Sequence, residues 1–104
     1  MIHVGKTARQ LRESLGLTQV EMAETLGITS VYVSKIENDH SFPTRQISDR
    51  YRERFGIDLY VLAWCQFGDI ENLPEPVRKS AVALAKAWEI RVEQLVKTHR
   101  KKGA

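Results

Sequence analysis

Hydrophobic side chains recur every three or four residues along the first two thirds of the chain, in short runs separated by turn-forming residues. Glycines at positions 16, 27, 56 and 68 close these runs, as glycine often does at helix ends. No run alternates strictly between apolar and polar residues, so strands are not expected. The pattern therefore predicts an all-α fold in which five short helices are connected by turns of a few residues.

Residues at the expected helix starts support this prediction. Thr7 can cap the first helix. Thr18 and Glu21 have the spacing of a capping box, in which the hydroxyl and the carboxylate each accept a hydrogen bond from the backbone N–H of the other residue. Asn38 is expected to end the third helix, in the left-handed conformation that asparagine tolerates. Thr29 and Asp58 are the candidate caps of the third and fifth helices, and Pro43-Thr44 is expected to open the fourth.

The last third of the chain has a different pattern. From residue 77 to about residue 98, apolar side chains follow a three-or-four spacing that predicts one long amphipathic helix. They are Val77, Ala81, Leu84, Trp88, Val92 and Leu95. We therefore expect a domain at residues 1–68, a linker with two prolines at 69–76, and a C-terminal helix at 77–104 whose basic tail, residues 99–102, is frayed.

Length and composition restrict the class of protein. With 104 residues, 42% of them hydrophobic, the chain can form one small domain with an appendage. Its longest apolar run, residues 59–65, is far shorter than the roughly 20 residues of a membrane-spanning helix. The first residues lack the apolar stretch of a secretory signal, and the single cysteine, Cys65, is expected to be a buried small hydrophobe. We expect a cytoplasmic protein without a membrane partner.

Candidate catalytic chemistry is sparse. The histidines at positions 3, 40 and 99 are scattered, so no metal site is expected. No nucleophile with a base, no paired carboxylates and no phosphate-binding glycine loop stand out, so neither an enzyme nor a cofactor is expected. The net charge of +3 divides into −2 for residues 1–72 and +5 for residues 73–104, and charge alone is a weak guide to nucleic-acid binding. A solvated face is expected for Glu13, Glu21, Glu24, Arg50 and Glu53.

The segment from residue 17 to residue 37 predicts two short helices joined by a sharp turn. Small Ala23 lies where two crossing helices must approach closely, and Gly27 lies where the backbone must turn. Ile28 can fix the second helix against the first. This is the pattern of a helix-turn-helix, whose second helix can enter the major groove of DNA. The expected core residues are Leu11, Leu15, Met22, Leu26, Val33 and Ile36.

These residues also resemble a known family. The series Thr18-Gln19, Ala23, Gly27-Ile28-Thr29, Val33-Ser34 and Ile36-Glu37 is similar to that of the lambda-repressor-like (Cro/repressor-type, XRE-like) DNA-binding domains of bacteria and phages. The resemblance covers about residues 6–67. It implies a five-helix domain that binds double-stranded DNA.

The outer surface of the third helix can read base edges. Val33 and Ile36 are expected to point into the core. Val31 could pack on a thymine methyl group, and Lys35 could donate to guanine O6 or N7 or to a phosphate. The candidate base-reading residues are Ser30, Val31, Tyr32 and Lys35.

Phosphate contacts and an ion pair follow from the resemblance. Gln19 matches the family's phosphate-clamp position, where the positive end of the helix dipole also favours an anion. Arg12 and Glu37 match a partly buried structural ion pair. The phosphate candidates are Gln19, Ser34, Asn38, Arg45 and Lys6.

One such module makes too few base contacts to select a site in a genome, so a homodimer on a palindromic operator is expected. The fifth helix is apolar on nearly every side, and its own domain can cover only one face. The expected dimer contacts are Trp64, Leu84, Trp88 and Leu95. The sequence does not decide whether the long helix pairs across subunits or packs on its own domain.

These features favour a transcriptional regulator, and a repressor is the simplest case. An alternative is an antitoxin or another protein-interaction module whose C-terminal helix binds a partner protein such as a toxin. In a third reading, the basic region 91–102 binds phosphates without specificity.

Overall fold

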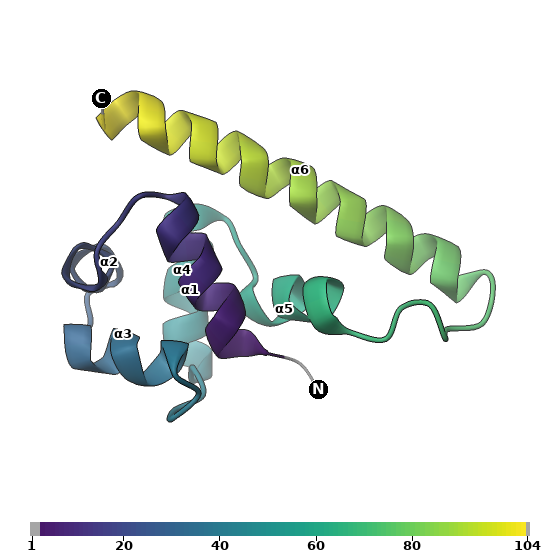
Figure 1. Ribbon diagram of the computed structural model, residues 1–104, viewed down its shortest axis with the longest axis horizontal. Helices are drawn as coiled ribbons and strands as arrows, with labels where there is room; N and C mark the ends of the chain where they lie inside the picture. Colours follow the sequence, from purple (N-terminus) through teal and green to yellow (C-terminus); the bar gives the residue numbers. More distant parts are fainter. Residues whose placement is uncertain (1–2, 104) are drawn as a thin grey trace.

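The computed structural model describes residues 3–103, with side chains described through residue 99, and this part of the chain is helical without any strand (Figure 1). The helices are α1 (Val4–Ser14), α2 (Gln19–Leu26), α3 (Ser30–Glu37), α4 (Arg45–Phe55), α5 (Leu59–Phe67) and α6 (Val77–Gly103). The predicted all-α fold, with five short helices and one long C-terminal helix, is confirmed.

Four of the helices begin at side-chain caps, and three of these caps are the ones that the sequence predicts. The Thr18 hydroxyl accepts from the Glu21 N–H at 3.1 Å, and the Glu21 carboxylate accepts from the Thr18 N–H at 3.0 Å. The backbone hydrogen bond also lowers the pKa of Glu21, whose exposed carboxylate serves as a cap. The side chains of Thr29, Thr44 and Asp58 cap α3, α4 and α5 in the same way.

The prediction for the first helix is wrong, because α1 begins before Thr7. The helix starts at Val4, and its N-cap residue, His3, makes no capping hydrogen bond with its side chain. Thr7 lies inside the helix, where its buried hydroxyl donates to Gln66 Oε1 at 2.8 Å. The N–H of Gly5 in the first turn donates instead to the Asp39 carboxylate at 3.1 Å. The start of α1 is therefore satisfied by a residue 34 positions away in the sequence.

The end of α3 also differs from the prediction. Asn38 has a φ of −98°, and the residue in the left-handed region is Asp39, with a φ of 58°. The Asn38 side chain donates to the Ser34 carbonyl at 2.8 Å, and the same carbonyl also accepts from the Asn38 N–H at 3.0 Å. The left-handed residue is therefore Asp39, one position after the predicted Asn38, and aspartate tolerates positive φ.

α1 to α5 surround a single hydrophobic core. Met22, Val33 and Ile57 are completely buried, and Tyr51 is 1% exposed. All six residues that the sequence predicts for this core are buried: Leu11, Leu15, Met22, Leu26, Val33 and Ile36.

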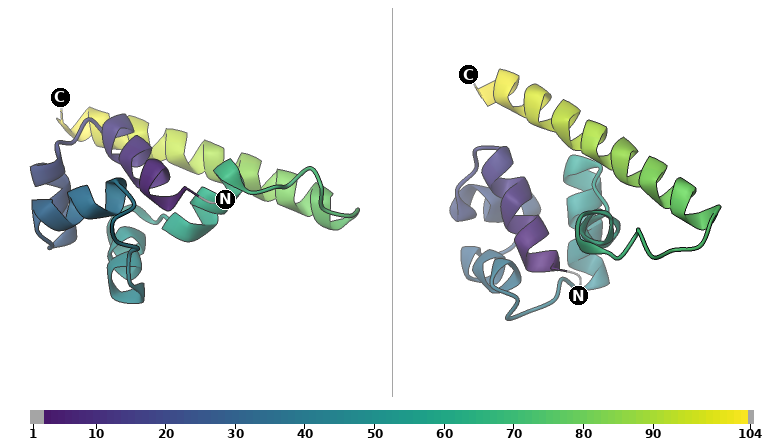
Figure 2. Two further views of the ribbon diagram at one scale, coloured as in Figure 1. Left: turned by 60° about the horizontal axis from the view of Figure 1, so that its bottom comes forward. Right: turned by 45° about the vertical axis from the view of Figure 1, so that its right-hand side comes forward.

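α6 packs across its own domain. The helix runs along one edge of the molecule and crosses α5, while α3 lies at the opposite edge (Figures 1 and 2). Its inner side chains pack against the core of the domain: Trp88, Val92, Leu95 and Val96. The helix continues to Gly103. The side chains of residues 100–102, and residue 104, lie outside the described part.

No helix in the described part of the chain combines the length and the apolar character that crossing a membrane requires.

Candidate nucleic-acid interface

α2 and α3 are joined by a three-residue turn whose geometry depends on Gly27. This glycine ends α2 in the left-handed conformation, with φ 68° and ψ 37°. The next residue, Ile28, donates its N–H to the Ala23 carbonyl at 3.0 Å and packs against the core. The Thr29 hydroxyl then accepts from the Tyr32 N–H at 3.1 Å and starts α3. These contacts fix the direction in which α3 leaves α2.

Arg50 of α4 holds this turn from outside the motif. Its guanidinium Nη1 donates to the carbonyls of Leu26 and Gly27 at 2.9 and 3.0 Å. The last carbonyls of a helix have no partner within it, and a cation is favoured at that end of the dipole. The prediction that Arg50 is one of the solvated charges is therefore wrong. No local signal reveals this role, because the bonded residues are 23 and 24 positions away.

α3 buries one face and presents the other to solvent. Val33 and Ile36 are buried in the core, whereas Val31 is 63% exposed and Lys35 is exposed. Ser30, Tyr32 and Ser34 are half-buried, and Tyr32 packs partly against the core. The four candidate base-reading residues thus lie within the eight residues of one short helix, with Val31 and Lys35 exposed and Tyr32 partly against the core. The first turn contributes three of them, as expected for the end of a recognition helix that enters a groove.

An ionic network connects α1 and α3 beneath this surface. Arg12 Nε donates to Glu37 Oε2 at 2.7 Å and Arg12 Nη2 donates to Glu37 Oε1 at 3.0 Å, which makes the pair bidentate. The Glu37 side chain is only 2% exposed. Arg12 Nη1 donates to the Leu17 carbonyl at 2.9 Å, so the guanidinium also holds the end of the α1–α2 turn. The hydrogen bond to Glu37 raises the pKa of Arg12 and keeps it charged.

The same carboxylate orients Gln19 at the start of α2. Gln19 Nε2 donates to Glu37 Oε1 at 3.2 Å, and the side chain is half-buried. An amide nitrogen carries two hydrogens, so one donor remains for a second acceptor. Gln19 is the first residue of α2, where the positive end of the helix dipole favours an anion.

The other phosphate candidates lie in different settings. Asn38 Nδ2 lies 3.3 Å from Ser34 Oγ, so these two residues are brought together at the end of α3. Arg45, the first residue of α4, is exposed and makes no ion pair with any side chain described through residue 99. Lys6 lies apart from them, with its ammonium 5.5 Å from the centre of the Phe67 ring on α5.

The connection between α3 and α4 is tied to two other helices. Asp39 accepts from the Gly5 N–H of α1, and the Tyr60 hydroxyl of α5 donates to the Pro43 carbonyl at 2.6 Å. A Cβ atom on Gly5 would lie 2.5 Å from the Ile36 carbonyl oxygen and 2.9 Å from that of Glu37, so α1 approaches α3 more closely than any side chain permits. Neither tie is predicted from the sequence, although a glycine inside a helix is itself a signal of close backbone approach.

The residues expected at a dimer contact lie on α5 and α6. Leu84 is 43% exposed, beside a hollow of about 330 Å³ that Gly56, Ala87 and Arg91 help to line. Trp64 is half-buried, and Trp88 and Leu95 pack against the core of their own chain.

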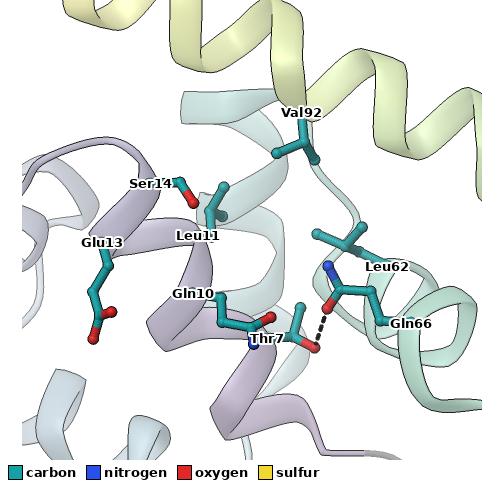
Figure 3. A pocket seen from close by; sticks show the side chains of 8 residues that line it. All are labelled: Thr7, Gln10, Leu11, Glu13, Ser14, Leu62, Gln66 and Val92. Atoms are coloured by element: carbon teal, nitrogen blue, oxygen red, sulfur yellow. Dashed lines mark hydrogen bonds between the residues drawn. The ribbon is translucent and has the colours of Figure 1, made fainter.

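A second hollow, of about 270 Å³, lies where α1, α5 and α6 meet. There Thr7 points toward Gln66 across the space between α1 and α5, and Val92 reaches in from α6 (Figure 3). The hydrogen bond of Thr7 to Gln66 therefore ties α5 to α1 directly beside the place where α6 packs.

Cys65 is half-buried rather than buried, and this burial raises the pKa of its thiol. Among the side chains that the structure describes, no three His, Cys, Asp or Glu residues gather in a group that could hold a metal ion.

Comparison with known proteins identifies the helices that contain this surface. The family model described as helix-turn-helix (HTH_3) matches residues 9–62, slightly more than half of the chain. The matched range begins inside α1, contains all of α2, α3 and α4, and ends within α5. Neither the curated proteins nor the solved structures contain a match to the chain. The chain belongs to the XRE/lambda-repressor-like helix-turn-helix family, whose domains bind DNA and regulate transcription.

Proposed function

We propose that the protein is a repressor that binds a palindromic DNA operator as a homodimer, with α3 in the major groove. The observation that carries this proposal is the arrangement of α3. Val33 and Ile36 anchor the helix in the core, while Val31 and Lys35 extend from its opposite side. Such a helix can enter a groove without disturbing the fold that supports it.

In this proposal the first turn of α3 reads the bases. Val31 packs on a thymine methyl group, and the Ser30 hydroxyl bonds a base edge beside it. Lys35, one turn later, donates to guanine O6 or N7, or to a phosphate. Tyr32 reaches a base or a phosphate with its hydroxyl. Together these side chains specify a short half-site.

Phosphate contacts around the groove set the position of α3. Gln19 donates its second amide hydrogen to a phosphate, and Glu37 holds it in place through the observed hydrogen bond. Ser34, Asn38 and Arg45 contact the backbone from the end of α3 and the start of α4. Lys6 is a further phosphate contact, once it moves away from the Phe67 ring.

A dimer is proposed because one α3 specifies too few base pairs, and two half-sites about 34 Å apart specify enough. Trp64 and the exposed Leu84 are the side chains proposed to contact the second subunit. Trp88 and Leu95 contribute to the dimer indirectly, because they hold α6 in position against its own domain. Such a dimer, acting in the cytoplasm, would cover promoter DNA and so repress transcription. We infer residues 1–68 as the DNA-binding unit, 69–76 as its linker and 77–104 as the element that completes the dimer.

Selection of bound sites from random duplex DNA tests the recognition residues. We expect Lys35→Ala and Ser30→Ala to select altered half-sites, with discrimination lost by about 1–3 kcal/mol at the affected base pair. Arg45→Ala is expected to weaken binding to all sequences and to reduce the salt slope by about one unit. Arg54→Ala removes the same charge from the other end of α4 and serves as the matched control. The proposal is wrong if the Lys35 and Ser30 variants select the same sites as the parent.

Exposed apolar side chains on α6 favour a second candidate function. Val77, Val82 and Ile90 are 52%, 55% and 45% exposed, which suits contact with a partner protein such as a toxin. The mass of the purified protein in solution distinguishes the two candidate functions. A dimer without any other protein supports the first candidate. A monomer that assembles only with a separate small protein supports the antitoxin alternative.

A further inference from the structure

Phe42 is the most exposed of the large hydrophobic side chains in the described part of the chain. Its exposed fraction is 66%, and it lies in the connection between α3 and α4, a segment whose ribbon runs at the edge of the molecule away from α6 (Figure 1). Single apolar side chains on a surface are common and need no function. Phe42 differs from such residues because the segment that carries it is held by hydrogen bonds.

The connection that carries Phe42 is held in place from several sides. The N–H groups of His40 and Ser41 donate to the Lys35 carbonyl at 2.9 and 3.2 Å. Asp39 is bonded to α1, and the Pro43 carbonyl is bonded to the Tyr60 hydroxyl of α5. The proline that follows Phe42 also restricts its backbone to extended conformations. The ring is therefore presented to solvent by an ordered segment rather than exposed by a loose one.

The residues on both sides of Phe42 suit a polyanion. Asn38 stands before it at the end of α3, and the exposed Arg45 stands after it at the start of α4. Asp39 is the acidic residue of this segment, and its carboxylate already accepts from the Gly5 N–H. An apolar ring between hydrogen-bond donors matches the nucleic-acid backbone, in which the carbon surface of each sugar lies between two phosphates.

We infer that Phe42 packs on a deoxyribose of the operator backbone, between the phosphates that Asn38 and Arg45 contact. This inference rests on the proposed function and adds a contact of a different kind. A sugar carries no base identity, so the contact strengthens binding to every sequence alike. It neutralises no phosphate, so it releases no counterion and leaves the salt slope unchanged.

Three variants of the full chain test the contact on one duplex selected by the parent and on one unrelated duplex. We expect Phe42→Ala to weaken binding to both by about tenfold, because some 50 Å² of apolar contact at 25 cal/mol per Å² is lost. Phe42→Leu keeps part of the apolar surface and should lose less. Val82→Ala shortens an apolar side chain of similar exposure on α6 and should leave binding unchanged. The melting temperature and the mass of each variant are measured alongside.

Each result decides the inference. Equal loss on both duplexes, with the salt slope and the mass of the parent, supports it. Parental affinity in Phe42→Ala overturns it and leaves the proposed function intact. A changed set of selected sites would make Phe42 a base reader, and a reduced mass would make it a subunit contact, so either result also overturns it. If the parent binds no duplex at all, the proposed function fails and the inference fails with it.

Discussion

Glu37 is a carboxylate placed almost wholly inside the protein, where an unpaired charge is costly. Arg12 meets it with two hydrogen bonds and Gln19 with a third. A buried pair of this kind adds little stability compared with well-packed apolar residues, but removal of one partner leaves the other uncompensated. The pair mainly positions other groups. Through Glu37, α3 fixes the approach of α1 by way of Arg12 and the orientation of Gln19 at the start of α2.

Substitution Glu37→Gln tests this view. It leaves the Arg12 guanidinium, whose side chain is 13% exposed, without its counter-charge, and the free energy of unfolding should fall by about 3 kcal/mol in urea denaturation. Glu13→Gln is the control, because Glu13 and its partner Arg9 are both more than half exposed and should change stability by less than about 0.5 kcal/mol. Equal effects of the two substitutions would mean that burial of the pair has no energetic consequence.

The start of a helix is predictable where the capping side chain and the backbone N–H that it bonds lie close in the sequence. The caps Thr18, Thr29 and Asp58 each bond a backbone N–H three residues onward, and this spacing is visible without a structure. The prediction failed at Thr7 and Arg50, whose partners lie 59 and up to 24 positions away. Hydrogen bonds of that range depend on how the helices pack, and no local pattern encodes them.

The candidate DNA-binding surface likewise has one part that local spacing predicts and another part that depends on how the helices pack. The spacing of Val33 and Ile36 marks the buried face of α3, so the outward positions of Val31 and Lys35 follow from helical geometry. The bond between Gln19 and Glu37 joins two helices, and the family resemblance indicates only that both residues belong to the site. The close approach of α1 to α3 at Gly5 was not predicted, because an isolated glycine does not identify what approaches it.

Gly5→Ala tests whether this approach holds the two helices together. In an open helix the change would stabilise by up to about 1 kcal/mol. Here the added methyl group meets the carbonyl oxygens of Ile36 and Glu37, which belong to the backbone and cannot rotate away. We expect a net loss of about 1–3 kcal/mol in urea denaturation. Gln10→Ala, at an exposed position of the same helix, should be neutral or slightly stabilising, and a Gly5 variant as stable as the parent would contradict the close approach.

At the scale of the whole molecule, α3 and α6 lie on different sides of the domain. α3 and the connection that follows it lie at one edge, and α6 covers α5 and α1 from the other (Figure 2). The family match ends before α6, so this helix lies outside the matched helix-turn-helix range. Arg91 of α6 reaches Gly56 at the end of α4, which adds a contact with a third helix. α6 therefore completes the domain and leaves apolar side chains exposed on its outer surface.

Trp88→Ala and Leu84→Ala separate these two roles of α6. Trp88 packs against the core, so its truncation should lower the free energy of unfolding by about 2–4 kcal/mol at every protein concentration. Leu84 is 43% exposed, so its truncation should leave the unfolding of a single subunit nearly unchanged while it raises the dimer dissociation constant. Urea denaturation over a hundredfold range of concentration, with the mass measured by sedimentation, distinguishes the two effects. A Trp88 variant with unchanged unfolding free energy but weaker self-association would mean that Trp88 contacts a second subunit rather than the core of its own domain. That result would contradict the packing described above.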